Sequence, residues 1–595
     1  MEYKQYFRYP ISTDMLIAKK RRIKRALREE LTAPVKKKIA ILGGSTTNEM
    51  ADQLELFLLF YGIDAEFYQS EYGQYWQDAM FGTPELDAFQ PDIIYIHTNW
   101  RNIDQFPAIT DTEQAVEDKI SAVCNHFQSA WTALSAKFNC PIIQNNFERP
   151  NYRLMGNRDI WDHRGRSNYI SRLNQFFYRF AAENKDFYIN DIDFLAADFG
   201  LSQWTDAFCW HMYKYAMNIN AIPLLANSVA NIIKALYGKN KKALVLDLDN
   251  TLWGGVIGDD GQEGIAIGPE VPEGQVYAEF QSYCKALKSL GVILAVNSKN
   301  EEENARLGLM HPDGILRPED FVAIKANWKP KDENIRQLAL ELNLGADSFV
   351  FADDNPAERE IVEMQVPGVD VPALTSVDRY IEVIDHGGFF ETTTLSEEDL
   401  KKTELYRANS QRIQEVQAFA SYEEYLDSLQ MQATIKSFDA ISISRIAQLT
   451  NKSNQFNLTT LRCNEDEIRA MQTQNDSWVT LQGRLEDKFG DNGIVSVVAG
   501  EILDSELHMR LWLMSCRVLK RGMEDAMMEK VIEVAQQRGI RRIFGYYYPT
   551  AKNAMVQNFY LAYGFRCTHS TESGNSVWEL EVDAYTHKNL HITVK

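Results

Sequence analysis

The sequence predicts a multidomain α/β protein with two parallel three-layer sheets followed by an α+β domain. Short apolar runs that end in Gly, Ser or Asp alternate with helical patterns over the first two thirds of the chain. This pattern is typical of parallel strands covered by helices. The last part alternates strands and helices around a basic glycine turn. The 595 residues, 45% hydrophobic and 24% charged, are enough for several globular domains.

Composition and glycine positions divide the chain into five parts. The basic run at 19–28 has apolar residues at roughly helical spacing, which indicates an amphipathic arm docked on the body. A landing site for an acidic carrier protein or an anionic membrane is the alternative. A basic junction at 238–242 and a glycine pair at 387–388 mark domain ends, and residues 396–399 form a helix-start signal. The expected parts are a basic arm (1–35), a first α/β domain (36–237), a second α/β domain (238–388), a helical connector (389–420) and a last domain (421–595).

Two strands of the first domain end in polar residues. One runs into Gly43-Gly44-Ser45, and the other ends in His97-Thr98-Asn99. Together with Asp206 and His211, these residues resemble the SGNH hydrolases, which have a flavodoxin-like sheet. The resemblance implies a Ser45 nucleophile, oxyanion donors at Gly44 and Asn99, and a relay through Asp206 and His211. The alternative is a binding or scaffold domain in which Ser45 caps a helix, because the motifs depart from the family pattern around Gly44, Asn99 and the Asp–His spacing.

The second domain opens with an apolar strand, 243–246, that ends in Asp247, Asp249 and Thr251. Side chains at i and i+2 of an extended chain share a side, so the two carboxylates crowd one another. Like charges at this distance require a cation or a proton between them. Mg²⁺ is the simplest choice, because it takes carboxylate oxygens and tolerates bound phosphate.

This Asp-x-Asp-x-Thr strand end resembles the haloacid dehalogenase (HAD) phosphotransferases. The resemblance implies that Asp247 is the nucleophile and Asp249 the general acid/base, with phosphate binding by Asn250 and Thr251. Three later elements match in order: Ser298 for phosphoryl binding, a lysine that neutralises charge, and an acid pair that completes the Mg²⁺ shell. Lys331 is preferred over Lys329, and Asp354 slightly over Asp353; the backbone carbonyl of Asp249 completes the predicted ligands.

The spacing between these motifs leaves no room for a large cap domain. Only 46 residues lie between Thr251 and Ser298, and 32 between Ser298 and Lys331. A site without a cap is open and can accept a long or macromolecular substrate. The insert at 253–274, rich in glycine and acids, is expected to form a small flap beside the site.

Longer segments narrow the resemblance. The stretches 247–261, 297–300, 351–360 and 448–460 resemble the FkbH-like proteins of the HAD-IIIC subfamily, from about residue 35 to residue 580. The resemblance implies that an activated acyl phosphate, 1,3-bisphosphoglycerate, is dephosphorylated and its glyceryl group loaded onto the phosphopantetheine thiol of an acyl carrier protein. The activity carries over less directly than the fold.

The last domain contains a strand ending at Cys516 and a basic turn opening a helix. These features resemble the GNAT acyltransferases, whose basic glycine turn binds the pyrophosphate of coenzyme A. Glu524 stands where a small residue is usual, which argues against ordinary acetyl-CoA binding; the single phosphate of a pantetheine arm would fit a weaker anion site. Cys516 is the candidate thioester carrier, with a buried packing cysteine as the alternative. The predicted acyl-handling residues are Cys516, Arg517, Lys520, Arg521 and Gly522.

Two functional hypotheses result. In the first, a Mg²⁺-dependent phosphatase or phosphotransferase forms an aspartyl-phosphate and is coupled to acyl transfer onto an acyl carrier protein. In the second, a plain phosphatase acts on a phosphorylated metabolite or sugar, and the flanking domains only bind. A net charge of −21 argues against nucleic-acid binding. Seven cysteines without a CxxC pair, no apolar membrane-spanning run and no signal peptide predict a cytoplasmic protein without a transmembrane segment.

Overall fold

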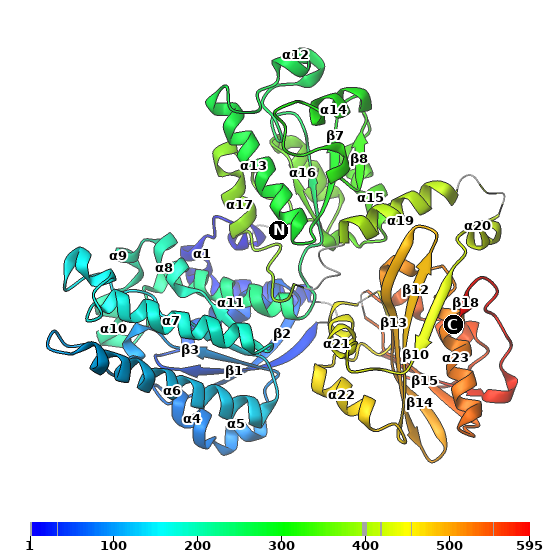
Figure 1. Cartoon of the computed structure of the whole chain (residues 1–595), viewed down its shortest axis with the longest axis horizontal. Coiled ribbons are helices and arrows are strands. Elements are labelled where there is room, and N and C mark those ends of the chain that lie inside the picture. The colour runs from blue at the N-terminus through cyan, green and yellow to red at the C-terminus, as the bar shows by residue number, and fades with distance from the viewer. Residues whose placement is uncertain are drawn as a thin grey trace. The chain divides into compact units, whose positions relative to one another are not determined.

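The computed structural model describes residues 3–31, 34–395, 402–416, 419, 421–453, 455–550 and 552–595 (Figure 1). The helix-start signal at 396–399 lies outside this range. The chain forms two compact units, Met1–Leu236 with Glu391–Thr393, and Tyr237–Phe390 with Thr394–Lys595. Each unit is described by itself below.

The basic arm at the start of the first unit packs on helix α3 (Asn48–Phe60). It consists of η1 (Lys4–Phe7), α1 (Thr13–Ala18) and α2 (Lys20–Glu30). Its apolar face is buried through Leu16, Ile23 and Leu27. Lys20 forms 2.7 Å ion pairs with Glu49 and Asp52 of α3. The arm is therefore held by an apolar stripe flanked by ion pairs, as its amphipathic pattern predicts.

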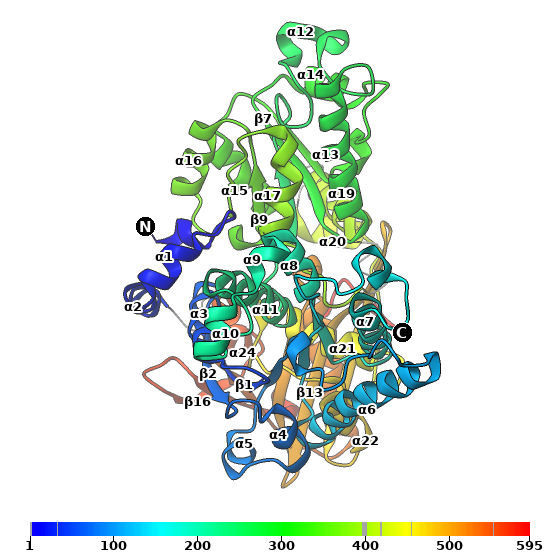
Figure 2. The same ribbon diagram turned by 90° about the vertical axis from the view of Figure 1, so that its left-hand side faces the viewer.

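The first unit is built on a five-stranded sheet with the order β2-β1-β3-β4-β5, in which every pairing is parallel. The strands are β1 (Val35–Gly43), β2 (Ile63–Gln69), β3 (Ile93–His97), β4 (Ile142–Asn145) and β5 (Phe187–Asn190). Alternate residues of β1 and β3 pack against α4 (Tyr75–Phe81), α5 (Pro84–Phe89), α6 (Glu113–Phe138) and α7 (Arg166–Glu183). Figure 2 shows α3 and α11 (Ile222–Leu236) on the other face of β1 and β2 from α4 and α5. The connection from β5 to α11 carries α8 (Ile192–Phe199), α9 (Leu201–Trp204) and α10 (Ala207–Tyr213).

One helix in the described part of the chain, Ile219–Leu236, is long and apolar enough to cross a membrane by length and composition. Its apolar window is 72% buried inside the protein, as is usual for a core helix. The helix packs against α3 in the three-layer structure.

The second unit begins with a four-stranded parallel sheet of order β8-β7-β6-β9. The strands are β6 (Ala243–Leu246), β7 (Ile293–Ser298), β8 (Ala323–Ala326) and β9 (Phe349–Ala352). The helices are α12 (Ile257–Gly264), α13 (Pro272–Ser289), α14 (Glu302–Leu309), α15 (Lys331–Leu342), α16 (Pro356–Gln365) and α17 (Tyr380–His386). The chain leaves β6 for β7 on one side and later places β9 on the other, so the carboxyl end of β6 is a topological switch point, the usual position of ligand sites in open α/β sheets.

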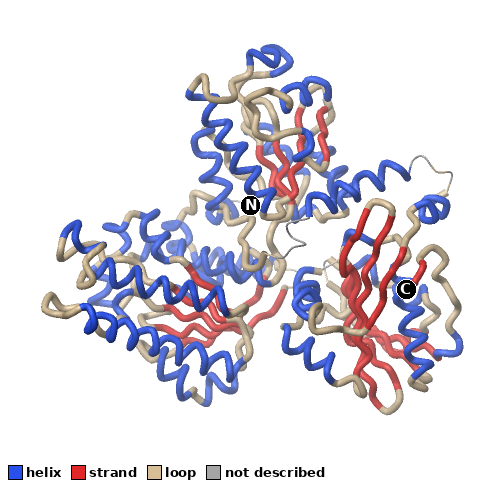
Figure 3. Tube along the Cα trace, viewed as in Figure 1, coloured by secondary structure: helices blue, strands red, loops and turns tan. Residues whose placement is uncertain are grey.

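The rest of the second unit contains a nine-stranded mixed sheet (Figure 3). Its order is β16-β17-β15-β14-β13-β12-β10-β18, with β11 added on β14. Residues 506–509 of β14 pair in parallel with β15, and residues 513–514 of the same strand pair with β11. One face packs against α23 and the other against α21 and α22. The bounds are α19 (Lys402–Val416), α20 (Tyr422–Ser428), β10 (Gln432–Lys436), α21 (Ile443–Lys452), β11 (Phe456–Asn457), α22 (Glu465–Thr473), β12 (Trp478–Asp487), β13 (Gly490–Leu503), β14 (Glu506–Met514), α23 (Met523–Gln537), β15 (Arg542–Tyr547), α24 (Phe559–Ala562), β16 (Arg566–Ser570), β17 (Ser576–Glu581) and β18 (Thr593–Val594).

The predicted fold class is confirmed. Two parallel sheets with helices on both faces precede a mixed sheet with helices on both faces. The order of the sheets along the chain is the order that the apolar runs and their polar ends predict.

Candidate functional site

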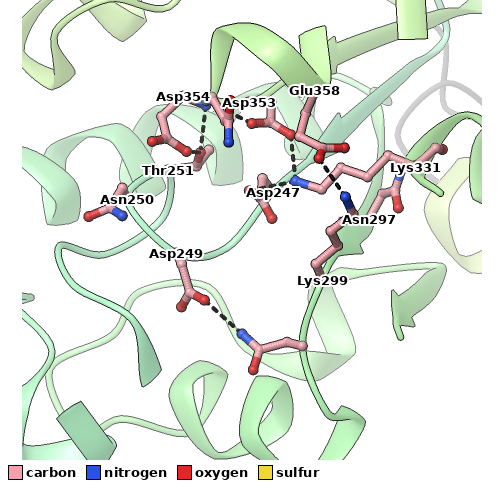
Figure 4. A network of polar contacts seen from close by, with 12 residues as sticks. Asp247, Asp249, Asn250, Thr251, Asn297, Lys299, Lys331, Asp353, Asp354 and Glu358 are labelled. Atoms are coloured by element: carbon pink, nitrogen blue, oxygen red, sulfur yellow. Dashed lines mark hydrogen bonds and ion pairs between the residues drawn. The ribbon is translucent and has the colours of Figure 1, made fainter. Parts of the chain in front are cut away.

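Asp247 follows β6 directly, and its carboxylate is held by a buried lysine (Figure 4). Lys331 Nζ lies 2.7 Å from Asp247 Oδ2 and 2.5 Å from Asp353 Oδ2. Lys331 is 3% exposed at the first turn of α15, and its carbonyl accepts a 2.9 Å hydrogen bond from Asn297 Nδ2. One buried cation therefore offsets two carboxylates.

Three carboxylates converge at this point. One oxygen from each of Asp247, Asp353 and Asp354 lies within 4.8 Å of the others. Asp247 Oδ1 is buried and has no hydrogen-bond partner. Burial, and then the charge of Asp247, raises the pKa of Asp353 to about 6, although Lys331 opposes the shift. An unpartnered buried carboxylate oxygen beside two further acids fits a hard divalent cation such as Mg²⁺.

The two acids after β9 have different surroundings. Asp353 is fully buried; its Oδ2 contacts Lys331 and its Oδ1 accepts a 2.8 Å hydrogen bond from the Asn355 amide. Asp354 is half-buried, with Oδ1 3.5 Å from Thr251 Oγ1. The carboxylate of Asp354 thus has fewer partners within the protein than that of Asp353. The roles of both residues as metal ligands stay predictions.

Asp249 has a separate set of donors. Its Oδ1 accepts hydrogen bonds from Trp253 Nε1 at 2.9 Å and the Ile257 amide at 3.1 Å, and its Oδ2 accepts one from Asn300 Nδ2 at 2.9 Å. Burial raises the pKa of Asp249, while these hydrogen bonds oppose the rise. Three donors therefore orient this carboxylate, and burial shifts its pKa above that of an exposed aspartate.

The predicted phosphate-binding residues do not all meet at the site. Thr251 and Ser298 are buried at the ends of β6 and β7. Asn250 has φ 54° and accepts a 3.0 Å hydrogen bond from the Gly255 amide, so it shapes the turn. Lys329 is exposed and lies 3.4 Å from Glu333, so the structure brings Lys331 to Asp247 and leaves Lys329 outside.

Several residues around the site had no role in the sequence prediction. Trp253 and Asn300 orient Asp249, and Asn334 donates to Asn297, which in turn holds the Lys331 carbonyl. Arg359 donates 2.7 Å hydrogen bonds to the carbonyls of Asp353 and Asp354. Trp253 and Asn300 lie inside recognisable motifs, but only packing shows which atom each one holds.

The predicted flap is small. Gly254 pairs with Ala266, and the residues between them form α12, which bends at Gly261. Helix α12 packs against α14 of the same domain. The segment is too short to form a separate layer over Asp247.

The predicted residues of the first unit are only partly gathered. Ser45 and Asn99 are each 1% exposed at the ends of β1 and β3, and Ser45 Oγ has no hydrogen-bond partner. Asp206 caps α10 by accepting a 3.0 Å hydrogen bond from the Cys209 amide, whereas His211 is exposed on the same helix. No described hydrogen bond joins Ser45, Asp206 and His211. The catalytic roles of these residues stay predictions.

The predicted acyl-handling residues occupy the turn between β14 and α23. Cys516 is half-buried, with Sγ 3.8 Å from the hydroxyl of Tyr406. Arg521 is 4% exposed and lies 3.1 Å from Asp487, which also pairs with Arg412. Arg521 therefore already has a carboxylate partner, which it shares with Arg412. Lys520 and Gly522 have positive φ values before α23, and Arg517 is buried with Nε 3.2 Å from Ser515 Oγ.

Comparisons with known proteins give a family match for the first domain and a structural likeness over a larger part of the chain. Residues 38–234 match the family model of the FkbH N-terminal domain. The chain is 29% identical, with a TM-score of 0.58, to the N-terminal part of protein BF1531 from Bacteroides fragilis, which contains a phosphatase domain complexed with Mg. That likeness covers 63% of this chain and 99% of the other.

Acetyltransferases give weaker structural matches. The ribosomal-protein-S18-alanine N-acetyltransferase of Escherichia coli is 15% identical, covering 27% of this chain and 99% of its own, with a TM-score of 0.21. The GNAT domain of S. lividans PAT is 18% identical, covering 25% and 89%, also with a TM-score of 0.21. A search of curated proteins found no match.

Proposed function

We propose that the second α/β domain is a Mg²⁺-dependent phosphatase or phosphotransferase with Asp247 as its nucleophile. The observation that carries this proposal is the Asp247 carboxylate. One of its oxygens contacts Lys331, the other is buried and unpartnered, and the group converges with two further acids. The phosphatase domain complexed with Mg in protein BF1531 supports it. The motifs around Asp247, Ser298, Lys331 and Asp354 further support an FkbH-like assignment within the HAD-IIIC subfamily.

The chain's own residues can perform both halves of the reaction. An Asp247 oxygen attacks phosphorus, the bond from phosphorus to the leaving oxygen breaks, and Asp249 protonates that oxygen. Asp249 then takes a proton from the water that cleaves the aspartyl-phosphate. Lys331 offsets negative charge beside Asp247 throughout. Mg²⁺, held by Asp247 and Asp354 with Asp353 and the Asp249 carbonyl as further candidates, would supply Lewis-acid charge stabilisation when bound.

The finer proposal is acyl transfer from an acyl phosphate to an acyl carrier protein. A thioester forms only if the carrier thiolate attacks the acyl carbon and the carbon–oxygen bond to phosphate breaks. Attack by Asp247 on phosphorus instead releases a free carboxylate. In the acyl-transfer version, Lys331 and, when bound, Mg²⁺ would hold the departing phosphate, and the SGNH-like and GNAT-like domains bind the carrier. The absence of a cap over the described site supports access for such a large acceptor.

Cys516 is the residue that could hold the acyl group within this chain. It lies half-buried against Tyr406, so a relay through it requires the turn at 515–522 to open.

Heavy-oxygen labelling separates the two versions. The protein is incubated in H₂¹⁸O with Mg²⁺ and a panel of acyl phosphates and phosphomonoesters, with and without a phosphopantetheinylated carrier protein. Attack by Asp247 followed by hydrolysis places ¹⁸O in the released phosphate, and chelation of Mg²⁺ stops the release. Acyl transfer yields unlabelled phosphate and a carrier mass increase. Phosphate release that persists in EDTA and in Asp247→Asn would overturn the proposed site.

A further inference from the structure

An exposed tryptophan follows strand β8 at the edge of the sheet that carries Asp247. Trp328 is 68% exposed, and it lies two residues beyond Ala326, the last residue of β8. Ala326 pairs in register with Ser298 at the end of β7. The two strands are parallel, so the chain leaves both of them at the same edge. A single exposed apolar side chain needs no explanation by itself, but this one stands beside the strand end that holds Ser298.

The loop that carries Trp328 is held by hydrogen bonds on both sides of the indole. The Asn327 amide donates to the Ser298 carbonyl at 3.1 Å, and Asn327 Oδ1 accepts a 3.0 Å hydrogen bond from the Lys329 amide. Trp328 itself donates from Nε1 to Glu301 Oε1 at 2.6 Å. The indole is therefore fixed at its N–H while most of its surface stays exposed. A side chain ordered in advance loses less conformational entropy when a ligand packs on it.

The contacts of Glu301 connect Trp328 to the leaving-group side of the Asp247 centre. Asn300 directly precedes Glu301 and donates from Nδ2 to Asp249 Oδ2 at 2.9 Å. One hydrogen bond, one peptide step and a second hydrogen bond thus link the Asp249 carboxylate to the indole. In the proposed reaction Asp249 protonates the leaving oxygen. The part of the substrate beyond that oxygen therefore begins at Asp249, on the side of the centre that Trp328 borders.

The exposed groups next to the indole are polar and carry both signs of charge. Glu301 and Lys329 are exposed, and Lys329 pairs with Glu333 at 3.4 Å. Exposed pairs of this kind are weak, so a bound ligand can compete with them. The face of an indole carries negative potential and attracts the weakly positive C–H bonds of a ring or the edge of a second aromatic system. This surface fits a flat ring with hydrogen-bonding groups at its rim better than a long apolar chain.

We propose that Trp328 determines substrate specificity by stacking on a ring in the leaving group of the substrate. This inference rests on the proposed phosphoryl transfer at Asp247 and names the class of its substrate. That class is a phosphate ester whose leaving group carries a ring with polar substituents. A sugar ring and a heterocyclic base share this chemistry, and Glu301 and Lys329 offer an acceptor and a donor to the substituents.

The test compares phosphate release from four compounds by the full chain in Mg²⁺. Glucose 6-phosphate and adenosine 5′-monophosphate carry a ring, whereas acetyl phosphate and glycerol 3-phosphate do not. We expect a lower KM for at least one ring-bearing phosphate than for either ring-free one. Trp328→Ala should raise that KM roughly tenfold, the effect of losing one stacking contact, and should leave the ring-free KM values unchanged. The ring-bearing compound that responds shows whether the ring is a sugar or a base.

Three further variants separate stacking from a structural role. Trp328→Phe keeps a flat ring without the Nε1 donor and should retain most of the preference, whereas Trp328→Leu keeps apolar surface without a ring and should lose it. Glu301→Ala removes the same hydrogen bond from the other side. If Trp328 only held the loop, Trp328→Phe and Glu301→Ala would lower kcat on all four phosphates alike. Leu340→Ala is the matched control, because Leu340 is 79% exposed on α15 of the same domain, and it should change nothing.

Calorimetric titration of Asp247→Asn with the same phosphates and Mg²⁺ measures binding without turnover. Failure of both ring-bearing phosphates to bind would overturn the proposal. So would a KM change in Trp328→Ala that is equal for all four compounds, or a ring preference that survives in Trp328→Leu. Phosphate release that persists in Asp247→Asn contradicts the nucleophile assignment instead. The Trp328 comparison stays readable in that case, because it compares substrates within one enzyme.

Discussion

The carboxyl edges of the two parallel sheets carry opposite chemistry. At the end of β6, carboxylates converge and a buried lysine offsets part of their charge. At the ends of β1 and β3, the donors Ser45 Oγ and Asn99 Nδ2 are buried without partners, and Arg101 lies against the rings of Trp100 and Trp210. The comparison teaches that one strand arrangement can present converging carboxylates or unpartnered donors. The residues at the strand ends decide which.

The largest expected effect separates the two edges. Asp247→Asn removes the nucleophile and should lower phosphate release by at least roughly 10³-fold, because covalent catalysis is lost. Ser45→Ala should leave phosphate release unchanged, since Ser45 belongs to the other edge. Phosphate release under single-turnover conditions, with mass spectrometry for the aspartyl-phosphate, checks both variants. Equal losses in the two would mean that the edges act as one site.

The next prediction concerns the buried cation. Lys331→Met leaves the carboxylates of Asp247 and Asp353 without their shared partner and should destabilise the second domain by about 3–5 kcal/mol. Lys329→Met is the matched control, because Lys329 is exposed, and should change stability by less than about 0.5 kcal/mol. Hydrogen exchange of the β6 and β9 amides measures both. Similar protection in the two variants would show that Lys331 is not needed to hold the acids.

The stability of the first unit should depend on pH through Glu148. Burial raises the pKa of Glu148 from 4.5 to about 7. The folded state thus binds the Glu148 proton more tightly than the unfolded state does. The resulting stabilisation of the folded state is fully present below about pH 4.5, the pKa of the unfolded chain. It is lost as pH rises toward 7, by roughly 3 kcal/mol. Hydrogen exchange at β3 and β4, corrected for intrinsic rates at pH 5 and 8, should show this loss. Glu148→Gln should remove it, and a pH slope unchanged in that variant would contradict the assignment.

The smallest expected effect concerns orientation of Asp249. Trp253→Phe preserves a ring against Gly308 but removes the Nε1 donor to Asp249. Phosphate release should fall roughly tenfold, and the pKa that Asp249 contributes to the pH–rate profile should move upward, since a donor to the ionised form is lost. Asn300→Ala should act in the same direction through the other oxygen. A lower rate with an unchanged pH profile would indicate altered packing instead.

The sequence predicted much of the Asp247 centre and less of the other sites. The strand ends carrying Asp247, Ser298 and Asp353–Asp354 were readable because acids and hydroxyls follow apolar runs directly. Lys331 and Lys329 were harder to separate, because one begins α15 and the other lies two residues before it, and only packing shows which of them points toward Asp247. Arg521 shows the converse case: a basic turn indicated an anion site, while Asp487 on a distant strand already pairs with it.

The sequence by itself determined the order of the domains, the apolar strands and the acids that end them, because periodicity and strand-end chemistry are local properties. Only the tertiary structure decided which lysine reaches Asp247, that Trp253 and Asn300 hold Asp249, and that His211 is exposed on α10. It also placed Arg101 between two tryptophans that are far apart in the sequence. Such contacts depend on how helices pack on the sheets, which no local pattern specifies.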